Sequence, residues 1–142
     1  MTSLALLQLV SPALPVGAFS YSEGLEVLVQ AGALKDEAIL EQWLRAELER
    51  GTLRLEAAAL SLFAEDLNRW QGVTDPSACR RIVDLDGWLL ATREAAEIRA
   101  QQRQMGGSLL QLLADMGHPL PEPVPLAWPA AWAWAATWGR GC

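Results

Sequence analysis

Apolar residues recur every three or four positions along most of this chain, and no stretch keeps the alternating pattern of a half-buried strand. One such stripe consists of Leu53, Leu60, Phe63, Leu67 and Trp70. At 142 residues the chain is long enough to bury several stripes in one core. The pattern therefore predicts an all-α fold, a single-domain orthogonal helical bundle of about six helices.

Glycine, proline and capping residues divide the chain into these helices. The expected helices cover residues 3–10, 20–31, 36–51, 53–70, 77–116 and 129–138. Asp75-Pro76 opens the long fifth helix, and Gly106-Gly107 interrupts it. A kink there, or a close contact with another helix, is expected. The stretch from His118 to Pro129 is too rich in proline to be helical throughout.

Composition and charge exclude several classes of protein. The net charge of −6 offers no basic field for nucleic acid or anionic lipid, so partners with basic surfaces are favoured. Cys79 and Cys142 are too few for a secreted disulfide framework. The N-terminus has no basic lead before its short apolar run, which argues against a signal peptide. A cytoplasmic protein is the expectation.

The segment from Ser11 to Glu26 is too irregular for generic helix packing to explain. Ser20 and Glu23 have the spacing of a capping box, in which each side chain satisfies a free N–H group at a helix start. This structural role leaves Tyr21 and Glu26 unexplained. A phosphate-binding loop is excluded, because the only lysine of the chain, Lys35, has no glycine-rich turn before it.

The polar middle of the predicted fifth helix admits two interpretations. One helical line follows Ile82, Leu85, Leu89, Thr92, Ala96, Arg99 and Arg103. If it faces the core, the two arginines need carboxylates or a partner, because an unpaired buried charge is costly. A neighbouring line follows Trp88, Ala91, Ala95, Ile98, Met105 and Leu109. If that line faces the core, the arginines are solvated and pair only weakly with nearby glutamates.

Residues for catalysis or metal binding are scarce. His118 is the only histidine and lies in a turn, and neither cysteine has a second ligand at motif spacing. No nucleophile can be paired with a histidine base, so a small helical hydrolase is disfavoured. We therefore expect no catalytic residue, no metal site and no cofactor, and hence a protein that is not an enzyme.

The segment from Ala127 to Trp138 contains four tryptophans among alanines. So much aromatic surface is typical of a core, an interface or a membrane-facing helix. Membrane-surface helices carry basic residues opposite their aromatics, and here only Arg140 is near. Packing against protein is the expectation.

Two strings in this chain resemble the UreF family of urease accessory proteins. The first is the proline–glycine loop that leads through an aromatic residue and serine to Gly24-Leu25-Glu26. The second is Glu97-Ile98-Arg99, followed by Arg103 and Gly106, at the family's distance from the first. The resemblance covers most of the chain.

This resemblance implies an all-α fold and frequently a homodimer. It also implies assembly with UreD, called UreH in some organisms, and with the GTPase UreG. That complex delivers nickel to the urease apoprotein, and the UreF component is thought to couple GTP hydrolysis to metal insertion. By resemblance, the expected partner-binding residues are Tyr21, Glu26, Glu97, Arg99 and Arg103.

Members of the family usually continue for tens of residues beyond the point that matches Cys142. Residues 1–142 are therefore expected to be a single UreF-like helical domain that lacks the C-terminal helices and tail of the family. An alternative function is a generic helical interaction module that docks a partner or a membrane surface through its Trp-rich segment.

Overall fold

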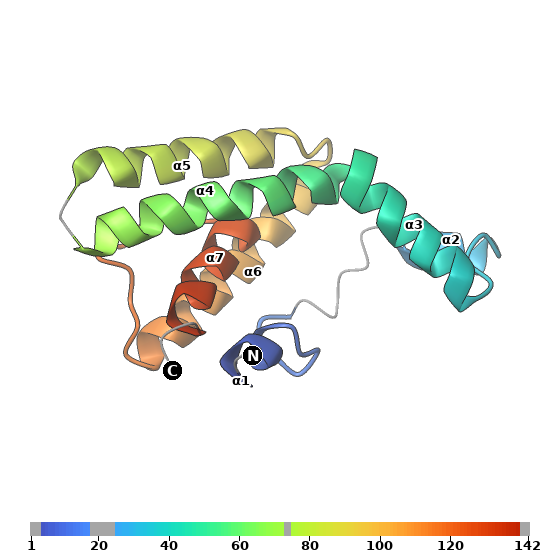
Figure 1. Cartoon of the computed structure of the whole chain (residues 1–142), viewed down its shortest axis with the longest axis horizontal. Coiled ribbons are helices and arrows are strands. Elements are labelled where there is room, and N and C mark those ends of the chain that lie inside the picture. Colours follow the sequence, from blue (N-terminus) through green and yellow to red (C-terminus); the bar gives the residue numbers. More distant parts are fainter. Residues whose placement is uncertain (1–3, 18–24, 73–74, 140–142) are drawn as a thin grey trace.

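A computed structural model describes residues 4–17, 25–72 and 75–139 of the chain. Within these ranges every regular element is an α-helix, and there are seven of them (Figure 1). The helices are α1 (Leu4–Leu9), α2 (Leu25–Gln30), α3 (Glu37–Arg50), α4 (Thr52–Gly72), α5 (Pro76–Ala91), α6 (Ala96–Asp115) and α7 (Trp128–Gly139). The predicted all-α fold is confirmed.

Several helix ends lie where the sequence predicts them. The Oδ1 atom of Asp36 accepts a hydrogen bond from the backbone N–H of Ile39 at 2.9 Å, which caps the start of α3. Asp75 caps α5 in the same way, with Pro76 at the first helical position. Gly32, at a φ of 69°, turns the chain after α2 in the left-handed conformation that glycine adopts without strain.

The prediction of one long helix over residues 77–116 is wrong. The chain leaves the helical path at residues 92–95, so that α5 and α6 are separate helices. The predicted interruption at Gly106-Gly107 is also wrong, because α6 passes through both glycines. Gly106 does make a close contact, but with the loop before α7 and not with a helix: a Cβ atom there would lie 2.4 Å from the carbonyl oxygen of Leu126.

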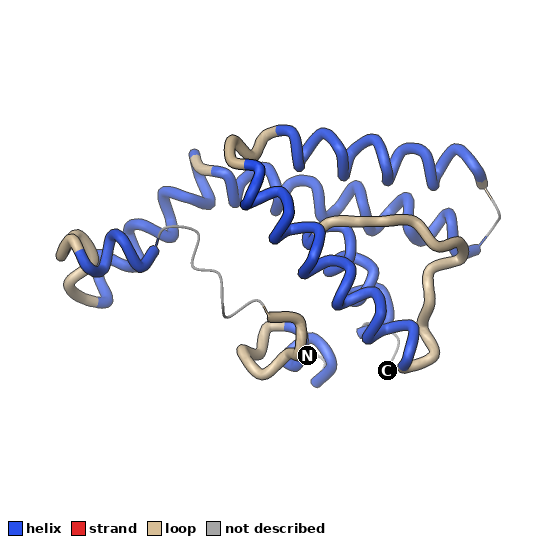
Figure 2. Tube along the Cα trace, turned by 180° about the vertical axis from the view of Figure 1, so that it is seen from behind, coloured by secondary structure: helices blue, strands red, loops and turns tan. Residues whose placement is uncertain are grey.

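The Trp-rich helix α7 lies at the centre of the molecule, in contact with α1, α4, α5 and α6 (Figures 1 and 2). The side chain of Trp134 is only 1% exposed. Its neighbours on the helix are small, and the buried alanines are Ala130, Ala131, Ala133, Ala135 and Ala136. These small residues allow other helices to approach closely. The expected packing of the Trp-rich segment against protein is confirmed.

The break at residues 92–95 resolves the two interpretations of the polar stretch. In α5 the first line is correct, since Ile82 and Leu89 are buried whereas Trp88 is 54% exposed. In α6 the second line is correct, since Met105 and Leu109 are buried. The non-helical residues change the rotational phase between the two helices, so each line faces the core in only one of them.

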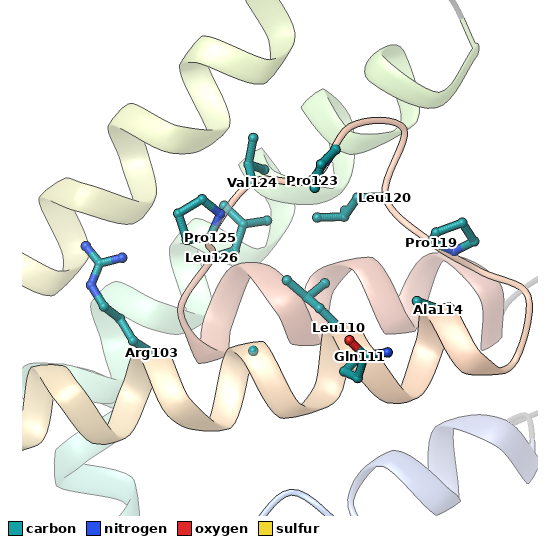
Figure 3. A pocket seen from close by; sticks show the side chains of 11 residues that line it. Arg103, Leu110, Gln111, Ala114, Pro119, Leu120, Pro123, Val124, Pro125 and Leu126 are labelled. Atoms are coloured by element: carbon teal, nitrogen blue, oxygen red, sulfur yellow. The ribbon is translucent and has the colours of Figure 1, made fainter.

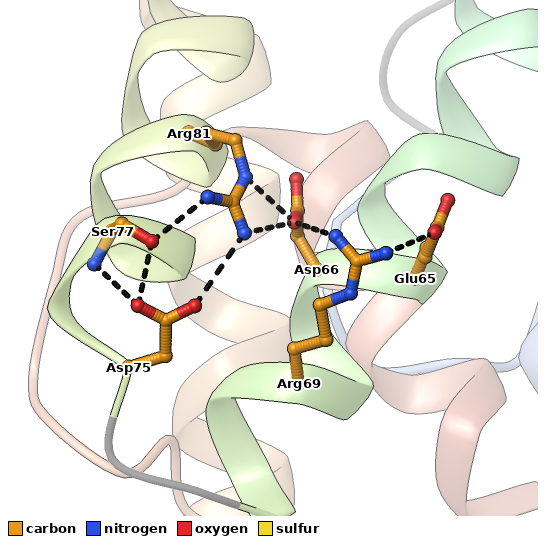
Figure 4. A network of polar contacts seen from close by, with 6 residues as sticks. All are labelled: Glu65, Asp66, Arg69, Asp75, Ser77 and Arg81. Atoms are coloured by element: carbon orange, nitrogen blue, oxygen red, sulfur yellow. Dashed lines mark hydrogen bonds and ion pairs between the residues drawn. The ribbon is translucent and has the colours of Figure 1, made fainter.

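Ion pairs join helices α4 and α5 near the end of α4 and the start of α5 (Figure 4). The carboxylate of Asp66 on α4 accepts hydrogen bonds from Nε and NH2 of Arg81 on α5, at 2.8 and 2.7 Å. The same guanidinium donates to the hydroxyl of Ser77. Asp66 and Asp75 raise the pKa of Arg81, and hydrogen bonds from Ser77 lower the pKa of Asp75. Asp75 is therefore held in its charged, accepting form.

The first three helices bury little. No residue of α1, α2 or α3 is fully buried. Figure 1 shows α3 extending away from the N-terminal end of α4, with α2 beside it. Three leucines of α3 are exposed: Leu40, Leu44 and Leu48. None of the helices in the described ranges combines the length and apolar character that a membrane crossing needs.

Candidate partner-binding surface

The break between α5 and α6 is held by Arg99. Its NH1 atom donates to the carbonyl oxygen of Arg93 at 2.6 Å and to that of Glu94 at 3.1 Å. These carbonyls have no helical partner, because the chain is not helical there. At the other side of the break, the Thr92 hydroxyl donates to the carbonyl of Leu89 at 2.6 Å. Arg99 therefore stabilises the turn that positions the first residues of α6.

An ion pair anchors this turn to the rest of the bundle. The guanidinium of Arg93 donates to the carboxylate of Glu56 on α4, and both side chains are mostly buried. A buried pair of this kind holds a defined geometry, because separating the charges leaves each of them without compensation. The turn at residues 92–95 is thus fixed relative to α4.

A groove opens beside this turn, and we call it the α2–α6 groove. Its volume is about 550 Å³. It is lined by Leu25, Trp43, Glu47, Thr52, Leu53, Thr92, Arg93, Glu94, Ile98 and Met105. The predicted residues Glu26 and Glu97 are exposed. Glu26 directly follows the lining residue Leu25, and Glu97 directly precedes the lining residue Ile98. Neither acid lines the groove itself; each is the chain neighbour of a lining residue, and 71 positions separate the two in the sequence.

Arg103 lies at a different groove (Figure 3). The loop between α6 and α7 runs back along α6, and a groove of about 480 Å³ lies between them, which we call the α6–proline groove. It is lined by Arg103, Gly107, Leu110, Gln111, Ala114, Pro119, Leu120, Pro123, Val124, Pro125 and Leu126. Arg103 stands at one end and Pro119 at the other. Arg103 therefore belongs to a groove whose lining includes none of the other predicted residues.

Three predicted residues, Tyr21 and the capping pair Ser20 and Glu23, lie outside the residues that the structure describes. Their roles stay predictions.

Asp86 is a polar core residue that the sequence analysis missed. It lies on α5, is 4% exposed, and its Oδ1 accepts a hydrogen bond from the backbone N–H of Ala127 at 2.9 Å. Burial raises the pKa of this carboxyl group, while the Ala127 hydrogen bond and the charge of Arg103 act against the rise. A signal was present: Asp86 follows the buried Ile82 by four residues and so lies on the core line of its helix.

Histidine and cysteine often bind metals, but here His118 and Cys79 are partly buried in the fold. The ring of His118 stacks on Trp138 with 4.4 Å between centroids, and its carbonyl oxygen accepts from Nε1 of Trp134. His118 is thus half-buried, whereas a histidine in a loop is usually exposed to solvent. The thiol of Cys79 is half-buried, and burial raises its pKa. In the part of the chain that the structure describes, no three His, Cys, Asp or Glu side chains gather as metal ligands would.

Comparisons with known proteins identify relatives of this chain. The family model described as UreF matches residues 34–139, a range that includes Glu97, Arg99 and Arg103. The protein named urease accessory protein UreF of Microcystis aeruginosa is 46% identical over 121 residues, 80% of this chain and 48% of the relative. The proteins of the same name from Methylibium petroleiphilum and Synechocystis sp. are 48% and 45% identical, over 76% and 80% of this chain and 43% and 49% of their own length.

The chain spans about half the length of the curated relatives it matches. No solved structure matches it.

Proposed function

The chain belongs to the UreF family of urease accessory proteins, and from this premise we propose that it acts as a non-catalytic scaffold in the nickel-dependent maturation of urease. In this role it links UreD (UreH) to the GTPase UreG and modulates GTP-dependent insertion of nickel into the urease apoprotein. The nickel ion is cargo of the complex. The proposed place of action is the cytoplasm.

The observation that carries this proposal is the arrangement at the α2–α6 groove. The string Glu97-Ile98-Arg99 begins a helix whose start is fixed by the Arg99–carbonyl bonds and by the Arg93–Glu56 pair. A surface fixed in this way loses little conformational entropy when a partner binds. The carboxylates of Glu26 and Glu97, each next in the chain to a residue that lines the groove, are exposed and suit a partner with a basic surface.

The rival function, docking through the Trp-rich segment, is disfavoured by burial. Trp134 is at the centre of the core, and the alanines around it are buried as well. A side chain that is already enclosed cannot anchor a partner unless the domain opens. The homodimer that the family resemblance implies is supported by a different surface, the exposed leucines of α3.

Restoration of urease activity in a bacterial strain that lacks its own UreF tests the proposal. We expect the chain to restore activity, and expect Glu26→Ala combined with Glu97→Ala to abolish most of it without loss of helicity. The matched control is Asp84→Ala, which removes an exposed carboxylate of α5 that does not line the groove. A folded wild-type chain that restores no activity, or a double variant as active as the control, would count against the proposed scaffold role.

A further inference from the structure

A small polar cavity, which we call the Asp86 cavity, lies where α4, α5, α6 and the entry to α7 come together. Its polar lining residues are Glu56 from α4, Asp86 from α5, Arg93 from the turn at residues 92–95 and Gln102 from α6. Asp86 is 4% exposed and Gln102 is 5% exposed. The side chains of Glu56 and Arg93 are mostly buried as well. Four polar side chains therefore line one cavity that has little access to bulk solvent.

The size of the Asp86 cavity restricts what it can hold. The space open to the centre of a water molecule is about 10 Å³. A single buried water needs roughly 10–15 Å³ of such space, and it also needs polar partners around it. The rest of the lining is apolar and comes from α5 and from the entry to α7. The cavity therefore has room for one water molecule and for no organic ligand.

The chemistry of the polar lining favours water over an ion. Glu56 and Asp86 offer carboxylate oxygens, which accept hydrogen bonds, whereas Arg93 and Gln102 carry N–H groups, which donate them. A cation would face the guanidinium of Arg93, and an anion would face two carboxylates, so either meets a like charge in the interior. A water molecule donates and accepts at once, and it suits both kinds of group.

The carboxylate of Asp86 has the capacity for such a ligand. A carboxylate can accept about four hydrogen bonds, and the backbone N–H of Ala127 supplies one of them, to Oδ1 at 2.9 Å. A buried water typically makes about three hydrogen bonds to buried polar groups. Asp86 can therefore hold Ala127 and a water molecule together.

We propose that one ordered water molecule occupies the Asp86 cavity and bridges the carboxylate of Asp86 to the Glu56–Arg93 ion pair. The ion pair fixes the turn beside the α2–α6 groove, and Asp86 fixes the entry to α7. The water joins these two supports into one hydrogen-bonded network, which links the turn to the core helix. This inference does not rest on the proposed function.

Nuclear magnetic resonance of the isotope-labelled chain tests the proposal in solution. A water molecule that stays in place longer than the protein takes to tumble gives nuclear Overhauser effects with the sign of a bound molecule, whereas surface water exchanges too quickly. We expect this effect between water and the backbone N–H of Ala127, because that group is bonded to the carboxylate that holds the water.

Two glutamines of α6 provide a variant and its matched control. Gln102→Met keeps the length of the side chain and removes its amide, so the water loses a polar partner and exchanges faster. We expect the effect at Ala127 to be lost in this variant. Gln104 is exposed on the same helix and does not line the cavity, so Gln104→Met should keep the effect. Circular dichroism should show that both variants keep the helicity of the wild type.

Two results overturn the proposal. The first is a wild-type chain without a bound-water effect at Ala127. The second is an effect of equal strength in the wild type and Gln102→Met, which would arise from an exchanging proton of Asp86 itself and not from a water in the cavity. Neither result bears on the proposed function, since the experiment contains no urease component.

Discussion

The carboxylate of Asp86 on α5 accepts a hydrogen bond from the backbone N–H of Ala127, one residue before the central helix α7 begins. The same short stretch of chain lies against Gly106 of α6, where the missing side chain makes room for the carbonyl of Leu126. Two helices therefore fix the point at which the chain enters the core. The position of the Trp-rich helix depends on both contacts.

The first prediction concerns the acceptor at Asp86. Asp86→Ala leaves the N–H of Ala127 buried without its partner, which should lower the free energy of unfolding by about 1–3 kcal/mol. Asp86→Asn keeps an oxygen acceptor and removes the buried charge, so at pH 7 it should be at least as stable as the wild type. Urea unfolding followed by circular dichroism measures both. Equal losses for the two variants would mean that the charge, not the acceptor, holds α7.

The second prediction concerns pH. The pKa of Asp86 is raised in the folded chain, so the folded state binds this proton more tightly than the unfolded state. The resulting stabilisation is fully present below the unfolded pKa of about 4 and is lost as the pH rises through the folded pKa. The free energy of unfolding of the wild type, minus that of Asp86→Asn, should therefore fall as the pH rises above about 4. A difference that rises over this range contradicts the buried environment of Asp86.

The third prediction compares two adjacent glycines. Gly106→Ala places a Cβ atom 2.4 Å from the Leu126 carbonyl oxygen, and the backbone must move to relieve the overlap. We expect a loss of about 1–3 kcal/mol in the free energy of unfolding. Gly107→Ala meets open space within a helix and should gain up to about 1 kcal/mol. Thermal unfolding of the two variants measures both effects. A Gly106→Ala variant as stable as Gly107→Ala would refute the close contact between α6 and the loop before α7.

How far the sequence predicts this fold depends on whether the determining contacts are local. The starts of α3 and α5 could be predicted because Asp36 and Asp75 cap residues two or three positions away. The break at residues 92–95 has no glycine or proline to mark it. It depends instead on Arg93 reaching Glu56, 37 positions earlier, which no local pattern reveals.

The candidate site has the same limit. Glu97 and Arg99 could be named because their spacing resembles a family string, but the sequence could not show that Arg99 binds the carbonyls of a turn. Nor could it separate Arg103 from Glu97, since both lie on one helix and only the folded loop that includes Pro119 and Val124 creates a second groove.

The fourth prediction tests the role of Arg99. Arg99→Ala removes the donor to two carbonyls of the turn and should destabilise the chain by about 1 kcal/mol. The effect should be local, because the turn opens before the bundle does. Hydrogen exchange should therefore accelerate in the first turn of α6 and remain unchanged in α4. Uniform acceleration throughout the chain would show that Arg99 supports the whole fold and not this turn.

The fifth prediction separates folding from docking at the Trp-rich helix. Trp134→Phe fills most of the space but removes the hydrogen bond to the carbonyl of His118, so the free energy of unfolding should fall by about 1–3 kcal/mol. Because this side chain is enclosed, the folded variant should still activate urease to the wild-type level. A variant of unchanged stability that has lost activation would support the rival, docking function.

The central claim is that this chain presents a fixed surface to the GTPase of the urease maturation complex, and retention of UreG measures it most directly. The chain is immobilised together with UreD, UreG is passed over it with GTP and Mg²⁺, and the retained UreG is quantified. The account predicts that the wild type and Asp84→Ala retain UreG, and that Glu26→Ala combined with Glu97→Ala retains at least about tenfold less. Equal retention by all three folded chains, or none by the wild type, would contradict it.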